Sequence, residues 1–212
     1  MPANALIEFD RGLGSRFVAG ADEAGRGCLA GPLVAAGVLF DYQRLGPAEQ
    51  SALALLNDSK RLTPPQREGL LPVVLSLART VTVVIRTAAQ IDRRGLHKMN
   101  LDALATALNL VAVEGGKCLS DGFALPGDVV AHEAVVHGDA TSAAIAAASI
   151  VAKVTRDRFM RDAAIRHSGW GFEQHFGYST AQHREAIGRI GLSPLHRRSF
   201  ASVAYTQPEL AV

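Results

Sequence analysis

Short apolar stretches alternate along the chain with longer segments of helical periodicity. The apolar stretches predict strands at residues 16–22, 33–40, 80–85 and 128–136, and a short Gly-Pro loop returns the second strand antiparallel to the first. Helices are predicted at residues 47–56, 64–78, 96–113, 141–165 and 180–190. Because strands and helices interleave, the pattern is typical of an α/β fold with a mixed sheet and a helical C-terminal part.

Capping residues support two of these helices. Thr63 stands directly before Pro64, which suits an N-cap followed by proline at the first helical position. Thr141 or Ser142 is suited to cap the helix that follows. Pro72 interrupts the helix predicted at residues 64–78. The chain shows no repeats and no low-complexity linker.

Composition allows a sizeable core, because 48% of the 212 residues are hydrophobic and 20% are charged. The net charge of +2 neither indicates nor excludes a polyanionic partner. The distribution is more informative: residues 151–200 hold nine lysine or arginine residues against four acids. Such an excess can follow a phosphate backbone, although charge count alone favours a solvated helical face.

Two cysteines, Cys28 and Cys118, have no metal-type spacing and are expected to pack as small apolar residues in a reducing compartment. The N-terminal segment lacks the pattern of a secretion signal, and no apolar stretch is long enough to span a bilayer. These features predict a cytoplasmic protein without membrane contact.

An acidic pair, Asp22-Glu23, follows the first predicted strand. Successive strand residues point to opposite faces, so both carboxylates can serve one site only if the strand ends there and the chain turns. The Gly25-Arg26-Gly27 segment supplies that turn and would bring backbone N–H groups close to a ligand. The alternative is a solvated turn with two exposed acids, which the pair alone does not exclude.

Two further aspartates follow short runs: Asp121 comes after residues 118–120, and Asp139 follows the strand that ends at Val135-Val136. Carboxylates at the ends of separate strands converge on one edge of an α/β sheet. Mutual repulsion among four of them would be relieved by divalent cations, and oxygen ligands select Mg²⁺ or Mn²⁺. Two such ions about 4 Å apart suit phosphodiester cleavage.

The sequence Ala-Gly-Ala-Asp-Glu-Ala-Gly-Arg-Gly at residues 19–27 resembles the signature of ribonuclease HII. Seven further segments match the same family in order along residues 16–200, at positions 31–36, 56–60, 121–122, 138–139, 148–157, 177–180 and 196–200. The resemblance implies a ribonuclease H-like fold with a central five-stranded mixed sheet flanked by helices and a C-terminal helical segment. It divides the chain into an N-terminal arm (1–15), a catalytic domain (16–168) and a C-terminal segment (169–212).

The resemblance also implies an enzyme and its site. Asp22, Glu23, Asp121 and Asp139 would bind the metal ions, and a metal-activated water would cut 5′ of the ribonucleotide, leaving a 3′-hydroxyl and a 5′-phosphate. Implied substrates are RNA–DNA hybrids and DNA duplexes with single ribonucleotides, bound by a monomer. Gly25, Arg26 and Gly27 would read the 2′-hydroxyl, Tyr178 would stack on the following deoxyribose, and Lys60 and Lys153 would contact phosphate.

Some residues leave alternatives. Lys153 is equally suited to a salt bridge with Asp157, and His183 and His196 are expected to form structural hydrogen bonds. Phe176 stands where relatives commonly have lysine, and the run before Asp121 is shorter and more polar than usual. A DNA nuclease of the same fold and a non-catalytic hybrid-binding module are the alternative functions.

Overall fold

The computed structural model describes residues 5–56, 62–200, 202 and 205. Five strands form one sheet in the order β3-β2-β1-β4-β5, with bounds Phe17–Ala24 (β1), Leu33–Asp41 (β2), Thr80–Arg86 (β3), Lys117–Asp121 (β4) and Glu133–Val135 (β5). β2 is antiparallel to both β1 and β3, whereas β4 is parallel to both β1 and β5. The expected five-stranded mixed sheet is therefore confirmed.

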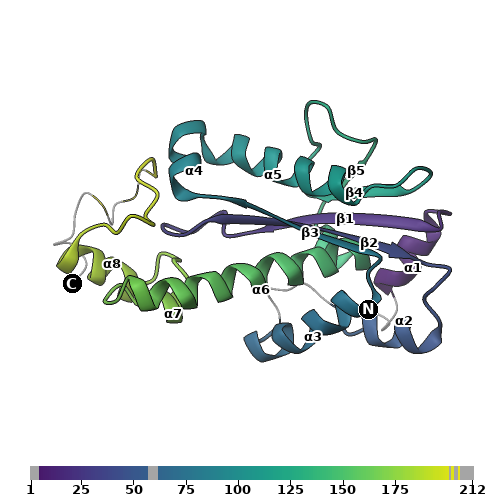
Figure 1. The fold of residues 1–212 in the computed structure, drawn as a ribbon, viewed down its shortest axis with the longest axis horizontal. Helices are drawn as coiled ribbons and strands as arrows, with labels where there is room; N and C mark the ends of the chain where they lie inside the picture. The colour runs from purple at the N-terminus through teal and green to yellow at the C-terminus, as the bar shows by residue number, and fades with distance from the viewer. Residues whose placement is uncertain (1–4, 57–61, 201, 203–204, 206–212) are drawn as a thin grey trace.

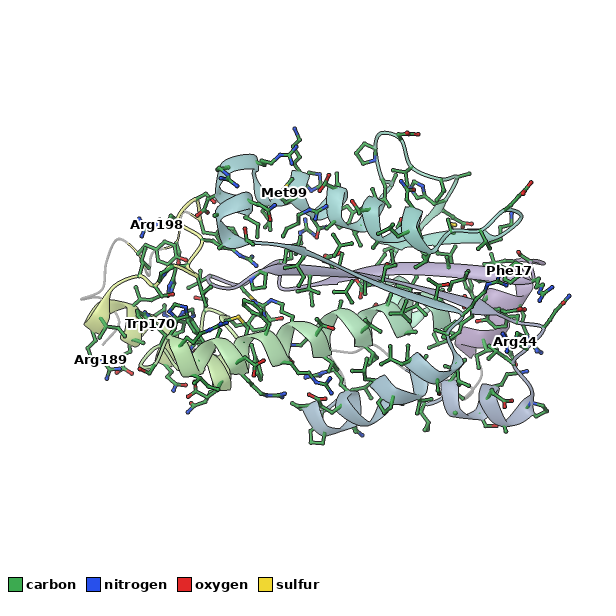
Figure 2. All side chains as sticks on the ribbon, viewed as in Figure 1. Phe17, Arg44, Met99, Trp170, Arg189 and Arg198 are labelled. Carbon is green, nitrogen blue, oxygen red and sulfur yellow. The ribbon has the colours of Figure 1, made fainter. Side chains whose placement is uncertain are left out.

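Helices cover both faces of the sheet (Figure 1). On one face lie α4 (Ala88–Arg94) and α5 (Leu96–Val111), whose Met99 is fully buried (Figure 2). The opposite face is covered by α1 (Ala5–Gly12), α3 (Pro64–Leu77) and the long α6 (Ala143–Arg166), with α2 (Pro47–Leu53) beside α3. Each face has its own apolar core, so the central strands β1 and β2 are buried on both sides.

The close packing of α6 on β1 follows from small side chains. The first turns of α6 are almost all alanine and are fully buried, and they lie against Gly20 of β1. A Cβ atom at Gly20 would lie 2.7 Å from the Ala144 carbonyl oxygen, so only glycine permits this approach. The Ser142 hydroxyl caps the helix by accepting from the Ile145 N–H at 3.3 Å, which confirms Ser142 rather than Thr141 as the cap.

Two expected elements were wrong in extent. The strand predicted at 128–136 is only three residues long, because its first part is a loop held by side chains rather than by the sheet. Asn109 of α5 donates to the Asp128 carbonyl and accepts from the Val130 N–H, both at 3.0 Å. The first strand extends past Asp22 and ends at Ala24, so the turn follows the acidic pair by two residues.

The remaining helices agree with the pattern or extend it. Thr63 begins α3, where the Thr63 N–H donates to the Gln66 carboxamide at 2.8 Å, and α3 continues through Pro72 to Leu77. The sequence pattern gave no sign of α1 and α4. Within the described residues, no helix is long and apolar enough to cross a bilayer.

The C-terminal segment is helical, as expected, and packs at the far end of α6 (Figure 1). It contains α7 (Phe172–His175), a single turn, and α8 (Ala181–Ile190), which Thr180 caps. Its loop contacts the loop after β1, since Leu29 N–H donates to the Gly177 carbonyl at 2.8 Å. The C-terminal segment thus lies beside the glycine-rich turn that the sequence singled out.

Candidate active site

Three of the four predicted carboxylates lie around one pocket. Asp22 and Glu23 lie near the end of β1, and Asp121 ends β4. The two strands are parallel neighbours paired through Ala21 and Ser120, so their carboxyl ends meet at one sheet edge. The pocket has a volume of about 340 Å³ and is lined by Asp22, Glu23, Ala24, Gly25, Arg26, Gly27, Asp121, Phe123, Ser149, Lys153 and Tyr178.

Asp22 lies at the centre of this charge cluster and is only 5% exposed. Burial, followed by the negative charges of Glu23 and Asp121, raises its pKa well above the usual range. A hydrogen bond from Ser149 and one from the Glu23 N–H to Oδ1, at 2.7 Å, partly oppose that rise. Three carboxylates this close together repel one another, and a bound cation would relieve that repulsion.

Asp139 lies beside the pocket but does not line it. It is buried in the short 3₁₀ turn Gly138–Ala140 that follows β5. The Gly138 N–H donates to Asp121 Oδ1 at 2.7 Å, which ties this turn to the end of β4. The residue before Asp139 is thus bonded to Asp121, while the role of Asp139 as a metal ligand stays a prediction.

The donors around the pocket suit a hard divalent cation. All acidic lining groups are carboxylates, and neither a thiol nor an imidazole lines the pocket, which fits Mg²⁺ or Mn²⁺ better than Zn²⁺. Among the described residues, no group of three or more His, Cys, Asp or Glu side chains is already arranged to hold a metal ion. The pocket therefore has the ligand atoms that such an ion prefers, but these atoms are not already arranged around one point.

Lys153 forms the ion pair that was one of its two alternatives, while the phosphate contact stays a prediction. Its Nζ is 2.7 Å from Asp157 Oδ1, and the residue also lines the pocket. The ammonium lies 5.3 Å from the Tyr178 ring centroid and 5.2 Å from that of Phe176. Burial lowers the pKa of Lys153, although the pairing with Asp157 favours the charged form. Phe176, which stands where the resemblance leads one to expect a lysine, therefore places an aromatic ring beside the Lys153 ammonium.

Tyr178 is 39% exposed and lines the same pocket as the acids. Burial of the phenol raises its pKa to about 12, so the hydroxyl is neutral near pH 7. His183 and His196 are buried beneath it, and the His183 imidazole Nδ1 contacts the Tyr178 carbonyl at 2.8 Å. The two imidazoles contact each other through Nε2 at 3.1 Å, so the expectation of structural hydrogen bonds is confirmed.

The turn after β1 is a close-packed structure. The Cys28 N–H donates to the Gly25 carbonyl at 3.5 Å across Arg26 and Gly27. Gly25 has a φ of 93°, and a Cβ there would lie 2.8 Å from Arg156 Cζ, so glycine is required on both counts. The Arg26 guanidinium lies over the Phe123 ring at 4.7 Å.

Sequence reasoning missed three contributors to this site. Ser149 bonds Asp22, Phe123 covers one wall, and the buried guanidinium of Arg156 packs against Gly25. Ser149 and Arg156 fall within a recognised motif, yet their burial follows from the long-range packing of α6. Lys60 lies outside the described residues.

Comparison with known proteins decides the family. The Ribonuclease HII family matches residues 19–203 of the chain. The chain belongs to the ribonuclease HII family. Ribonuclease HII of Mycobacteroides abscessus is 47% identical over 198 residues, which cover 93% of this chain and 82% of the relative. Ribonuclease HII of Mycobacterium avium is 46% identical over 186 residues, which cover 88% and 79%.

Solved structures agree with the family assignment. The ribonuclease H2 from Pyrococcus horikoshii OT3 superposes with a TM-score of 0.74 at 27% identity, covering 91% of this chain and 97% of that one. Bst-RNase HIII in complex with Mn²⁺ has a TM-score of 0.76 at 21% identity, covering 98% and 73%, and so shares the fold. As a member of the ribonuclease HII family, this chain is a divalent-metal-dependent ribonuclease H that acts on RNA–DNA hybrids.

Proposed function

We propose that the chain hydrolyses the RNA strand of hybrids and also cuts 5′ of single ribonucleotides embedded in duplex DNA, leaving a 3′-hydroxyl and a 5′-phosphate. The observation that carries the proposal is one pocket whose lining includes both the acids Asp22, Glu23 and Asp121 and the turn at residues 25–27. A phosphodiester beside the acids would thus have its neighbouring ribose beside the turn.

Asp22, Glu23, Asp121 and Asp139 would hold one or two Mg²⁺ or Mn²⁺ ions. When bound, such ions stabilise the charge on the attacking and leaving oxygens and make water more acidic. Asp22 and Asp121 would hold the central position, because the two lie close enough for the charge of Asp121 to affect the pKa of Asp22. Ser149 would orient the Asp22 carboxylate through its hydrogen bond.

Recognition of the ribose would fall to Gly25, Arg26 and Gly27, because backbone groups of an exposed turn can reach a 2′-hydroxyl that DNA lacks. The partly exposed Tyr178 ring would stack on the following deoxyribose. Lys153 would attract the phosphate near that ring, and Lys60 would also contact phosphate. The chain would act as a monomer, with residues 16–168 as catalytic domain and residues 169–212 as a C-terminal segment packed on it.

The test is cleavage of a labelled DNA duplex with one ribonucleotide, in Mg²⁺, Mn²⁺ or chelator, beside an all-DNA duplex of the same sequence. A metal-dependent cut just 5′ of the ribonucleotide, lost in Asp22→Asn and absent from the control duplex, is the expected result. Cleavage of the all-DNA duplex would indicate a DNA nuclease. Binding of the hybrid with no cleavage in either metal would indicate a non-catalytic module.

A further inference from the structure

Two arginines are fully buried beside the glycine-rich turn. Arg156 of α6 and Arg197 of the C-terminal segment are each 0% exposed. Burying a guanidinium costs several kcal/mol unless its N–H groups are bonded. Here both side chains donate to backbone carbonyls at 2.8–3.0 Å, Arg156 to Ala30, Pro32 and Phe176, and Arg197 to Arg26 and Gly31. The two side chains thereby hold the loop after β1 from within the protein.

Arg197 forms a hydrogen bond to the central peptide group of the turn that lines the pocket. Its Nη1 donates at 3.0 Å to the Arg26 carbonyl, which belongs to the central peptide of the turn closed by the Cys28 N–H and the Gly25 carbonyl. In a trans peptide the C=O and the following N–H point in opposite directions. Holding the Arg26 carbonyl inward therefore directs the Gly27 N–H away from the buried guanidinium.

That outward side of the turn is the pocket side. Gly27 is exposed and lines the pocket, and within the described residues its N–H donates to no protein acceptor. A free, directed N–H at the wall of an acidic pocket is a donor that a ligand oxygen can use. The direction of this donor is set by a side chain located about 170 residues further along the chain.

We propose that Arg197 is a positioning residue that fixes the central peptide of the turn, so that the Gly27 N–H is presented to the 2′-hydroxyl oxygen of the ribonucleotide. This inference rests on the proposed function, because it assigns a structural cause to its ribose recognition. The Arg26 and Gly31 carbonyls accept from two different nitrogens of Arg197, Nη1 and Nε, whose fixed planar spacing the single nitrogen of a lysine ammonium does not reproduce.

Other contacts hold Arg197 itself in place. Its backbone N–H donates to the Leu29 carbonyl at 2.8 Å, and its guanidinium lies 5.2 Å from the centroid of the Phe200 ring. The next residues are held from the opposite face of the sheet, because Asp92 of α4 accepts from the N–H groups of Arg198 and Ser199 at 3.0 and 2.9 Å. Burial lowers the pKa of Arg197 to about 10, so the side chain stays charged near pH 7.

The test compares Arg197→Lys and the neutral Arg197→Gln with Arg189→Lys as the matched control. Arg189 also donates to a backbone carbonyl, that of Gly169, but lies at the C-terminal end outside the pocket (Figure 2). Each protein is assayed for kcat/KM on duplexes with one ribonucleotide or one 2′-fluoro nucleotide at the same position. Binding of the all-DNA duplex is measured alongside.

We expect both Arg197 variants to lose about 10- to 100-fold in kcat/KM on the ribonucleotide substrate. Activity on the 2′-fluoro substrate and binding of the all-DNA duplex should change less than about twofold, because neither has a 2′-hydroxyl oxygen to accept from the Gly27 N–H. The ratio of kcat/KM on the ribonucleotide substrate to kcat/KM on the 2′-fluoro substrate should therefore fall by a similar factor. Equal losses on both substrates, or an unchanged ratio, would overturn the inference, since a general structural defect does not distinguish them.

A measurement without substrate separates this inference from the proposed function. In protein labelled with ¹⁵N-glycine, the Gly27 amide resonance should move in Arg197→Lys and Arg197→Gln and stay in place in Arg189→Lys. If the wild type cut no ribonucleotide substrate, the proposed function would fail while this resonance still reported on the turn. A Gly27 resonance that ignores both Arg197 variants would refute the positioning role.

Discussion

Gly20→Ala should separate β1 from α6, the packing on which the site depends. The new Cβ would lie 2.7 Å from the Ala144 carbonyl oxygen and closer still to the Ala144 carbon and the Ile145 nitrogen. Ordinary contacts need at least 3.4 Å, and these are backbone atoms in the first turn of a helix, which cannot rotate away. Overpacking of a core typically costs 1–3 kcal/mol, so a backbone clash on this scale should cost about 3 kcal/mol or more.

The same replacement at Gly69 supplies a control of opposite sign. Gly69 is exposed within α3, and a Cβ there meets nothing within 4 Å. Alanine should therefore stabilise the protein by about 0.5–1 kcal/mol, since glycine is the poorer helix former. For a domain of this size, about 1 kcal/mol moves Tm by roughly 2–4 °C.

Urea unfolding at constant pH, with the slope m compared between proteins, measures both free-energy changes, and thermal unfolding measures the corresponding changes in Tm. The expected Tm changes are a fall of roughly 6–12 °C for Gly20→Ala and a rise of roughly 1–4 °C for Gly69→Ala. Because Asp22 follows Gly20 by two residues on the same face of β1, Gly20→Ala should also lower cleavage activity. A Gly20→Ala protein within about 1 kcal/mol of the wild type would refute the argument from close approach.

Three further outcomes follow from buried charges. Asp22→Asn should abolish cleavage yet leave the metal-free protein as stable as the wild type or more so in urea, because it removes a buried charge beside Glu23; a large loss of stability in chelator would contradict this. Asp10 is fully buried and its pKa is raised to about 6, so wild-type stability should fall by up to about 3 kcal/mol as pH rises from 4 to 6.5, a slope that Asp10→Asn should lack. Burial lowers the pKa of His183 and His196 to about 4, so the stability that the neutral imidazoles contribute should be present above pH 6.5 and lost as pH falls towards 4. NMR titration checks the two pKa values, and an imidazole that titrates near 6.5 would contradict them. Asp10 and the two histidines change the free energy of unfolding in opposite directions over the same pH range. Each effect is therefore measured as the difference in unfolding free energy between the variant and the wild type.

The sheet edge could be predicted because it depends on local pattern. Apolar runs ending at Asp22 and Asp121 indicate strands whose carboxyl ends meet, and parallel pairing of β1 with β4 brings them together. The three-residue extent of β5 could not be predicted in the same way. Residues 128–132 look like strand, but Asn109 binds their backbone from another helix, and no local pattern records such a contact.

The burial of individual charged residues could not be predicted from the sequence pattern either. From sequence, Arg156 and Arg197 count as two of the basic residues between 151 and 200, whereas the fold places both inside the protein on carbonyl groups. Local periodicity gives no warning, because their acceptors are at least 20 residues away in the chain and mostly more than 100. The missed α4 belongs here too, since Asp92 of that helix anchors the segment that carries Arg197.

The local positive charge has a consequence for how this chain selects its substrate. Beyond the two buried arginines, Lys153 pairs with Asp157, and Arg158 and Arg161 both pair with Glu68. Five of the nine basic residues in that stretch are therefore buried or paired with an acid, so the charge excess seen in the sequence overstates the positive charge that is free to bind phosphate. Phosphate contacts give affinity without distinguishing RNA from DNA. If the proposed positioning role of Arg197 is correct, a turn whose peptide is held by a buried guanidinium would provide the complementary property, an N–H donor directed at the 2′-hydroxyl by which the two nucleic acids differ.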